Sequence, residues 1–183
     1  MAQVKSIIGV KRAFEDTSEN IQDHYEYLPD LLADFPMEVA LAYCFARLEY
    51  AQNMALYCGV VKIHHANAEV ARDIISVHRM TREKFLKLYH TVFGFEPPGT
   101  ARDALKTAED ARDDVMHGKP ATAERLRNAL VNVLEYSDAM HRQLTNRVEL
   151  SPFGDLRGFS GRAKKYEPEA TRFMLKGMGF AVS

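Results

Sequence analysis

Arg112 and His117 stand five positions apart in a segment whose side chains could cleave a phosphodiester. Arginine offers a planar fork of N–H donors that suits phosphate oxygens, and histidine readily takes up and releases protons near neutral pH. On RNA, histidine would remove the proton from the 2′-hydroxyl as this oxygen attacks the neighbouring phosphorus. Arginine would stabilise the negative charge that develops on the phosphoryl oxygens. This chemistry needs no metal and would leave a 2′,3′-cyclic phosphate.

Asp113 follows the arginine and stands four residues before the histidine. At that spacing on a helix, its carboxylate could orient the imidazole or simply be solvated at the helix end, and both interpretations stay open. The other two residues also have structural alternatives. Arg112 could form a salt bridge within the chain, for example with Glu109, and His117 could cap the C-terminus of a helix.

The segment is predicted to be a helix over residues 101–117, with the arginine on its packing face. At 100° per residue, one narrow sector contains Arg112 and the apolar residues Ala101, Leu105, Ala108, Val115 and Met116. A buried guanidinium without partners is costly, so Arg112 must meet an acid, a bound anion or a wet interface with another chain. On an ideal helix His117 lies about 140° away. A dimer, or an unwinding at Gly118, would therefore be needed to bring arginine and histidine together.

This segment resembles the motif of the HEPN superfamily, in which an arginine, a polar residue, three further residues and a histidine end one bundle helix before a turn. The matching residues are Arg112-Asp113-Asp114-Val115-Met116-His117-Gly118-Lys119. The likeness extends by architecture over residues 36–150, although its sequence signature is confined to these eight residues. It implies a metal-independent endoribonuclease acting on RNA as a homodimer, in a toxin–antitoxin or phage-defence setting, with Arg112, Asp113 and His117 as catalytic residues.

Two other functions stay open. Some HEPN proteins have lost catalysis, and here the same residues could instead lock a dimer or bind a nucleotide or a protein partner. A di-metal carboxylate bundle is the less favoured alternative, because it needs inward glutamates that the sequence does not convincingly provide. Its candidate ligands would be Asp114 with His117, Asp138 with His141, and Glu38, Glu49 and Glu69. We therefore expect no metal or other cofactor.

Composition and charge set the class of protein. The chain has 183 residues, of which 46% are hydrophobic and 27% charged, so disordered and low-complexity classes are excluded. A net charge of -1 argues against a polybasic nucleic-acid coat, and any RNA site must be local. The N-terminus lacks a signal-peptide core, and charged residues interrupt every stretch long enough to span a bilayer. We expect a cytoplasmic protein with no membrane partner, and a separate chain as antitoxin if one exists.

Helical periodicity dominates and predicts an all-α protein, an up-and-down bundle of four main helices with short accessory helices at the N- and C-termini. The main helices are expected over residues 36–58, 68–93, 101–117 and 120–148, and shorter ones over 18–35, interrupted near Pro29, and 168–176. The expected boundary signals are Gly59, Gly94, a Thr100/Asp103 capping pair, Gly118 and Pro120. Cys44 and Cys58 then share a helix, about 21 Å apart, and are expected to be reduced core residues.

Three regions are expected along the chain: an ambiguous segment over residues 1–17, the HEPN-like bundle over 18–150, and a basic tail over 151–183 packed on the same domain. Residues 157–176 contain six basic side chains against two acidic ones, a local charge of +4. A weaker candidate for RNA binding lies here, where the basic residues alternate with the aromatic residues Phe159 and Tyr166. Its basic residues are Arg157, Arg162, Lys164 and Lys165.

Overall fold

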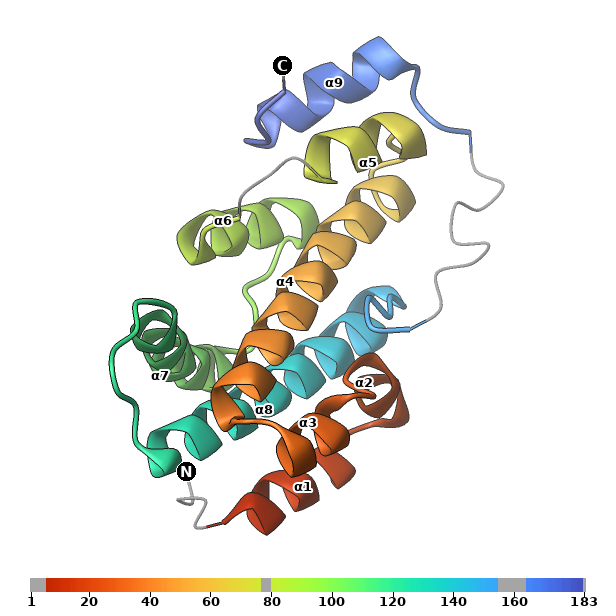
Figure 1. Cartoon of the computed structure of the whole chain (residues 1–183). Coiled ribbons are helices and arrows are strands. Elements are labelled where there is room, and N and C mark those ends of the chain that lie inside the picture. The colour runs from red at the N-terminus through yellow and green to blue at the C-terminus, as the bar shows by residue number, and fades with distance from the viewer. Residues whose placement is uncertain (1–5, 77–79, 155–163, 183) are drawn as a thin grey trace. The chain divides into compact units, whose positions relative to one another are not determined.

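The computed structural model describes residues 6–76, 80–154 and 164–182, and every regular element within these ranges is a helix (Figure 1). The described helices are α1 Ile7–Glu15, α2 Glu19–His24, α3 Leu28–Asp34, α4 Met37–Lys62, α5 Ala68–Ser76, α6 Arg82–Phe93, α7 Gly99–Met116, α8 Ala123–Val148 and α9 Pro168–Gly177. The all-α class predicted from the sequence is thus confirmed for this part of the chain. None of the helices described is both long and apolar enough to cross a bilayer.

The chain divides into two compact units. Unit 1 consists of Met1–Leu48 and Pro98–Arg147, and unit 2 of Glu49–Pro97 and Val148–Ser183. The first part of α4 therefore belongs to unit 1 and the rest to unit 2. These two units are groups of residues that contact one another within the chain, and they do not test the number of domains. The single domain expected from the sequence stays a prediction.

In unit 1, α8 connects elements that are far apart in the sequence. The apolar face of α8 is buried, and the buried amide of Asn132 donates to the main-chain carbonyl of Ala104 on α7 at 3.1 Å. On another part of α8, the hydroxyl of Ser137 lies 2.8 Å from the hydroxyl of Tyr25, which is fully buried next to α2. These polar contacts are satisfied inside the core, so they fix the register of α8 against α7 and α2.

His24 and Arg47 join the end of α2 to the unit 1 part of α4. The imidazole Nε2 lies 2.9 Å from the main-chain carbonyl of Arg47, and Nδ1 lies 3.3 Å from Nη2 of the same arginine. Arg47 Nε in turn donates to the main-chain carbonyl of His24 at 2.8 Å. A neutral imidazole with its proton on Nε2 satisfies both ring nitrogens, and the histidine is only 4% exposed. Burial favours the uncharged form of His24, and this contact gives both of its ring nitrogens a partner.

In unit 2, α4 does not end at Gly59, contrary to the prediction, but continues to Lys62. A Cβ atom on Gly59 would lie 2.4 Å from Cγ1 of Val92 and 2.8 Å from ring carbons of Phe93. The glycine thus allows α6 to approach the backbone of α4 closely. Around it the helix is buried on every side from Ala55 to Val61, as expected for a helix with apolar residues around its whole circumference.

Replacing Gly59 with alanine is expected to lower the free energy of unfolding by about 1 to 2 kcal/mol, because the clash with Val92 and Phe93 outweighs the gain in helix propensity. Urea unfolding followed by circular dichroism measures this change. Gly177→Ala is the matched control, since a Cβ there meets nothing within 4 Å. A Gly59 variant as stable as this control would show that α4 and α6 do not pack closely in solution.

Three further predicted helix boundaries are wrong, and in two of these cases a threonine side chain caps the helix at another residue. The helix expected over residues 68–93 is two helices, and Thr81 Oγ1 accepts the N–H of Lys84 at 3.3 Å to begin α6. The Thr100/Asp103 pair does not start α7, whose N-cap is Pro98 without a side-chain hydrogen bond. Pro120 precedes α8 rather than opening it, and Thr122 Oγ1 accepts the N–H of Arg125 at 3.2 Å.

The terminal elements agree better with the sequence. Pro29 lies in the first turn of α3 and separates it from α2, and α9 covers the helix predicted near residues 168–176. In unit 2, α9 packs on α5, where the N–H of Asn67 donates to Thr171 Oγ1 at 3.0 Å. Both cysteines are buried free thiols; burial raises the pKa of Cys58 to about 12 and also raises that of Cys44.

Candidate active site at the turn between α7 and α8

The C-terminus of α7 forms a Schellman turn. His117 is the C-cap, and Gly118 adopts the left-handed conformation with φ of 69°. The N–H of Gly118 donates to the carbonyl of Val115 at 3.0 Å, and that of Lys119 donates to the carbonyl of Asp114 at 2.8 Å. The glycine is required here because other residues adopt a positive φ only with strain. The end of the helix predicted at Gly118 is therefore confirmed.

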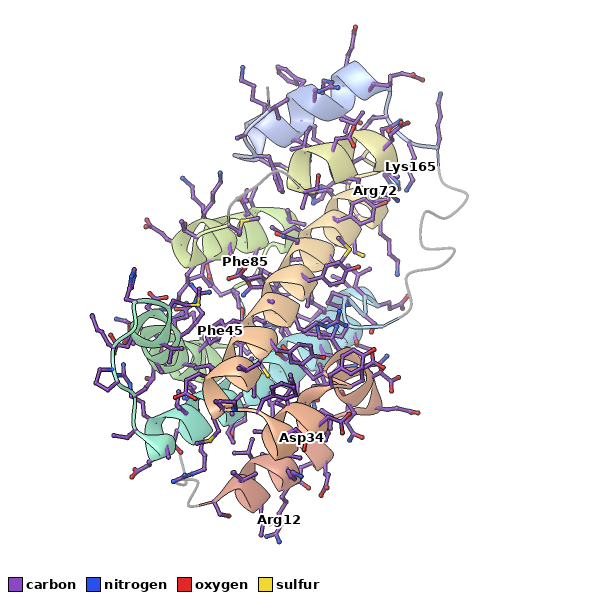
Figure 2. The ribbon with its side chains drawn as sticks, in the orientation of Figure 1. Arg12, Asp34, Phe45, Arg72, Phe85 and Lys165 are labelled. Atoms are coloured by element: carbon purple, nitrogen blue, oxygen red, sulfur yellow. The ribbon has the colours of Figure 1, made fainter. Side chains whose placement is uncertain are left out.

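Arg112 lies on the packing side of α7, with its side chain 32% exposed. Its Cζ atom is 4.9 Å from the centre of the ring of Phe45, which comes from the unit 1 part of α4 (Figure 2). Nε and Nη2 each donate to Oδ1 of Asp113 at 3.2 Å. The arginine therefore meets an acid, one of the three partners expected, and an aromatic face that the sequence did not reveal.

This arrangement holds the guanidinium of Arg112 in place but would allow another anion to replace the carboxylate of Asp113. The aromatic ring supports one face of the arginine, while Asp113 contacts its edge and is itself 59% exposed. An ion pair between partly exposed groups contributes at most about 1 kcal/mol. A phosphate oxygen could therefore take the place of the carboxylate at the edge of the guanidinium.

His117 is exposed, and its main-chain N–H donates to the carbonyl of Asp113 at 3.0 Å. This bond keeps the helical register up to the histidine, so the angle of about 140° from Arg112 applies. The left-handed residue comes only afterwards, at Gly118, and does not turn the Cα–Cβ bond of His117 towards the arginine. Arg112 and His117 of one chain therefore leave α7 in different directions.

Asp114 fastens the end of α7 to the start of α8, a role that sequence reasoning missed. Its two carboxylate oxygens bind Arg125 Nη1 at 2.5 Å and Lys119 Nζ at 3.1 Å. These hydrogen bonds, that from Arg125 first, lower the pKa of Asp114 below its usual value. Opposite charges on the two sides of the Gly118 turn are the signal that could have identified this contact.

Asp138, one of the residues considered for a di-metal site, binds a main-chain N–H and an arginine. Asp138 accepts the main-chain N–H of Ser18 at 3.1 Å through Oδ1 and binds Nη2 of Arg142 at 2.6 Å through Oδ2. Burial lowers the pKa of His141, three residues further on. Within the described ranges, no three His, Cys, Asp or Glu side chains are placed to hold a metal ion.

The weaker candidate site in the basic tail is described only in part. Arg157 and Arg162 lie outside the described residues, and Lys164 is exposed. Lys165 lies near the C-terminal end of α4, where its Nζ donates to the carbonyl of Val61 at 2.7 Å (Figure 2). This lysine belongs to unit 2, whereas the motif of α7 belongs to unit 1.

The turn therefore combines a supported guanidinium, a carboxylate at its edge and an exposed imidazole on one helix end. Arg112, Asp113 and His117 are brought into one segment, and Phe45 and Asp114 hold that segment in place. Searches with the whole chain find no matching family model, no matching curated protein and no matching solved structure.

Proposed function

We propose that the protein is a metal-independent endoribonuclease of the HEPN type, which cleaves RNA by transesterification. His117 acts as general base or acid, Arg112 stabilises the charge of the transition state, and Asp113 polarises or orients the pair. The observation that carries the proposal is the exposed imidazole at the C-cap of α7, following a supported arginine and preceding a glycine turn into α8. The same order of features characterises the HEPN motif.

The proposal includes a homodimer, since His117 and Arg112 of one chain leave α7 in different directions. It also includes the up-and-down bundle of four main helices, with short accessory helices at the N- and C-termini. The proposed setting is a cytoplasmic toxin–antitoxin or phage-defence system, with the antitoxin on a separate chain. Arg157, Arg162, Lys164 and Lys165 stay a secondary proposal for RNA contacts.

A cleavage assay with the purified chain tests the function. Single-stranded RNA is incubated with the protein in excess EDTA, and the ends of the fragments are analysed. Cleavage that persists in EDTA and leaves 2′,3′-cyclic phosphates supports the proposal. Intact RNA, or cleavage that requires added magnesium or manganese, contradicts it.

A non-catalytic module for dimerisation or partner binding is the second candidate, and one observation favours it. The guanidinium of Arg112 already has a carboxylate and an aromatic ring as partners, as a purely structural arginine would. In that case Arg112→Ala would shift the monomer–dimer equilibrium in analytical ultracentrifugation, while no RNA would be cleaved by the unmodified protein.

A further inference from the structure

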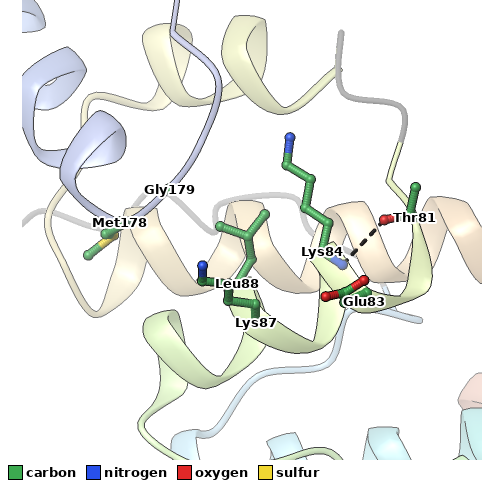
Figure 3. A pocket seen from close by; sticks show the side chains of 7 residues that line it. All are labelled: Thr81, Glu83, Lys84, Lys87, Leu88, Met178 and Gly179. Carbon is green, nitrogen blue, oxygen red and sulfur yellow. Dashed lines mark hydrogen bonds between the residues drawn. The ribbon is translucent and has the colours of Figure 1, made fainter.

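A cavity of about 280 Å³ opens in unit 2 between the first turns of α6 and the segment after α9 (Figure 3). It is lined by Thr81, the N-cap of α6, and by Glu83, Lys84, Lys87 and Leu88 of α6 itself. The segment after α9 adds Met178 and Gly179. One bound water accounts for about 30 Å³, so the space is large enough for a small organic molecule.

The spacing of the lining residues explains the character of the cavity. Lys84, Lys87 and Leu88 are separated by three and four positions, so they lie on the same face of α6. Figure 3 shows both lysine side chains extending from α6 beside Leu88, with Met178 on the segment after α9. Two ammonium groups thus border a space whose apolar lining comes from Leu88 and Met178, of which the leucine is 2% exposed.

The electrostatics favour an anion. Two lysines outnumber the single carboxylate of Glu83 in the lining. The cavity also lies beside the N-terminus of α6, a helix of 12 residues whose dipole adds positive potential at this end. Thr81 accepts the N–H of Lys84 and so keeps the first turn of the helix in place beside the cavity.

We propose that this cavity binds a small amphiphilic anion, with its carboxylate or phosphate between Lys84 and Lys87 and a short hydrocarbon chain against Leu88 and Met178. The site is independent of the proposed ribonuclease activity, since its residues are in unit 2 and the motif is in unit 1. A single-stranded nucleic acid fits less well. None of the lining residues described is aromatic, so bases gain no stacking, and Glu83 repels a polyanion.

Isothermal titration calorimetry with four probes tests the proposal on the full chain. Octanoate and octyl phosphate carry charge and chain together, whereas octanol lacks the charge and inorganic phosphate lacks the chain. The site is supported if octanoate, octyl phosphate or both bind at least about tenfold more tightly than octanol and inorganic phosphate. The ratio of the affinities for octanoate and octyl phosphate identifies the preferred head group. Absence of binding by both amphiphilic anions overturns it.

Variants locate the binding. Lys84→Met with Lys87→Met removes both charges but retains aliphatic chains, and it is expected to weaken the amphiphilic anions at least about tenfold. Met178→Asp places a negative charge in the lining and is expected to abolish their binding. Lys176→Met is the matched control, because this exposed lysine of the same unit does not line the cavity. The affinity of this variant for the amphiphilic anions is expected to stay within about twofold of that of the unmodified protein.

Three results would overturn the assignment. Unchanged affinity in the double lysine variant would place the ligand elsewhere, and an equal loss in Lys176→Met would indicate general surface charge. Binding of a single-stranded RNA oligonucleotide that depends on Lys84 and Lys87, without binding of either amphiphilic anion, would instead assign these lysines to nucleic acid. Circular dichroism spectra equal to that of the unmodified protein ensure that each variant is folded.

Discussion

Alanine at His117 or at Arg112 is expected to lower the rate of RNA cleavage at least about a hundredfold, the usual effect of removing a general base or a charge-stabilising donor. The effect should be on catalysis rather than on folding. His117 is exposed at a helix end, and Arg112 is partly exposed, with an aromatic contact that contributes only about 1 kcal/mol. Fragment formation over time in EDTA, normalised to folded dimer, measures the change. His90→Ala, an exposed histidine of unit 2, is the control.

A mixture of the two inactive variants tests whether the site is shared between copies. In a mixed dimer, one site receives arginine from the His117 variant and histidine from the Arg112 variant, so it is complete. If half of the dimers are mixed and each has one complete site, activity returns to about a quarter of the unmodified level. A mixture as inactive as its components would contradict a site shared between two copies. Full activity of both single variants would remove the ribonuclease proposal.

Acidification is expected to destabilise the fold through His24, by about 3 kcal/mol between pH 7 and pH 4. Burial lowers the pKa of His24 from 6.5 to about 4, although its hydrogen bond to the main-chain carbonyl of Arg47 acts in the opposite direction. Below pH 6.5 the unfolded chain takes up the proton more readily than the folded one. The contribution of His24 to the free energy of unfolding is therefore fully present above pH 6.5 and is lost as the pH falls towards 4.

Urea unfolding at several pH values measures this loss, with His24→Gln as the comparison. Glutamine does not titrate, so the difference in stability between the two proteins should shrink as the pH falls from 7 to 4. Burial of His141 lowers its pKa too and acts in the same direction, but this contribution is common to both proteins and cancels in the difference. Parallel pH profiles of the two proteins would show that burial does not keep His24 neutral in the folded chain.

The sequence predicted long helices better than their boundaries. Apolar periodicity located α4, α7, α8 and α9, because a buried helical face needs regular spacing. It treated Gly59 as a terminator, whereas tertiary packing against Val92 makes the glycine an interior contact. It also joined α5 to α6, because a single threonine cap at position 81 interrupts the apolar pattern only weakly.

The candidate site shows the same difference between local and distant information. The Schellman turn depends on neighbouring residues, so Gly118 revealed the end of α7. The ring beneath Arg112 comes from Phe45, far away in the sequence, and only the fold brings the two together. The cavity of unit 2 was missed although the spacing of Lys84, Lys87 and Leu88 was visible, since its other wall comes from the C-terminal segment.

The buried thiols give each unit its own chemical reporter. Cys44 belongs to unit 1 and Cys58 to unit 2, and they are the two cysteines of the chain. Because the thiolate is the reactive species, the raised pKa of each group protects it from alkylation while its surroundings stay closed. The rate at which iodoacetamide modifies each position, separated by peptide mass spectrometry, therefore measures how often that half of the molecule opens.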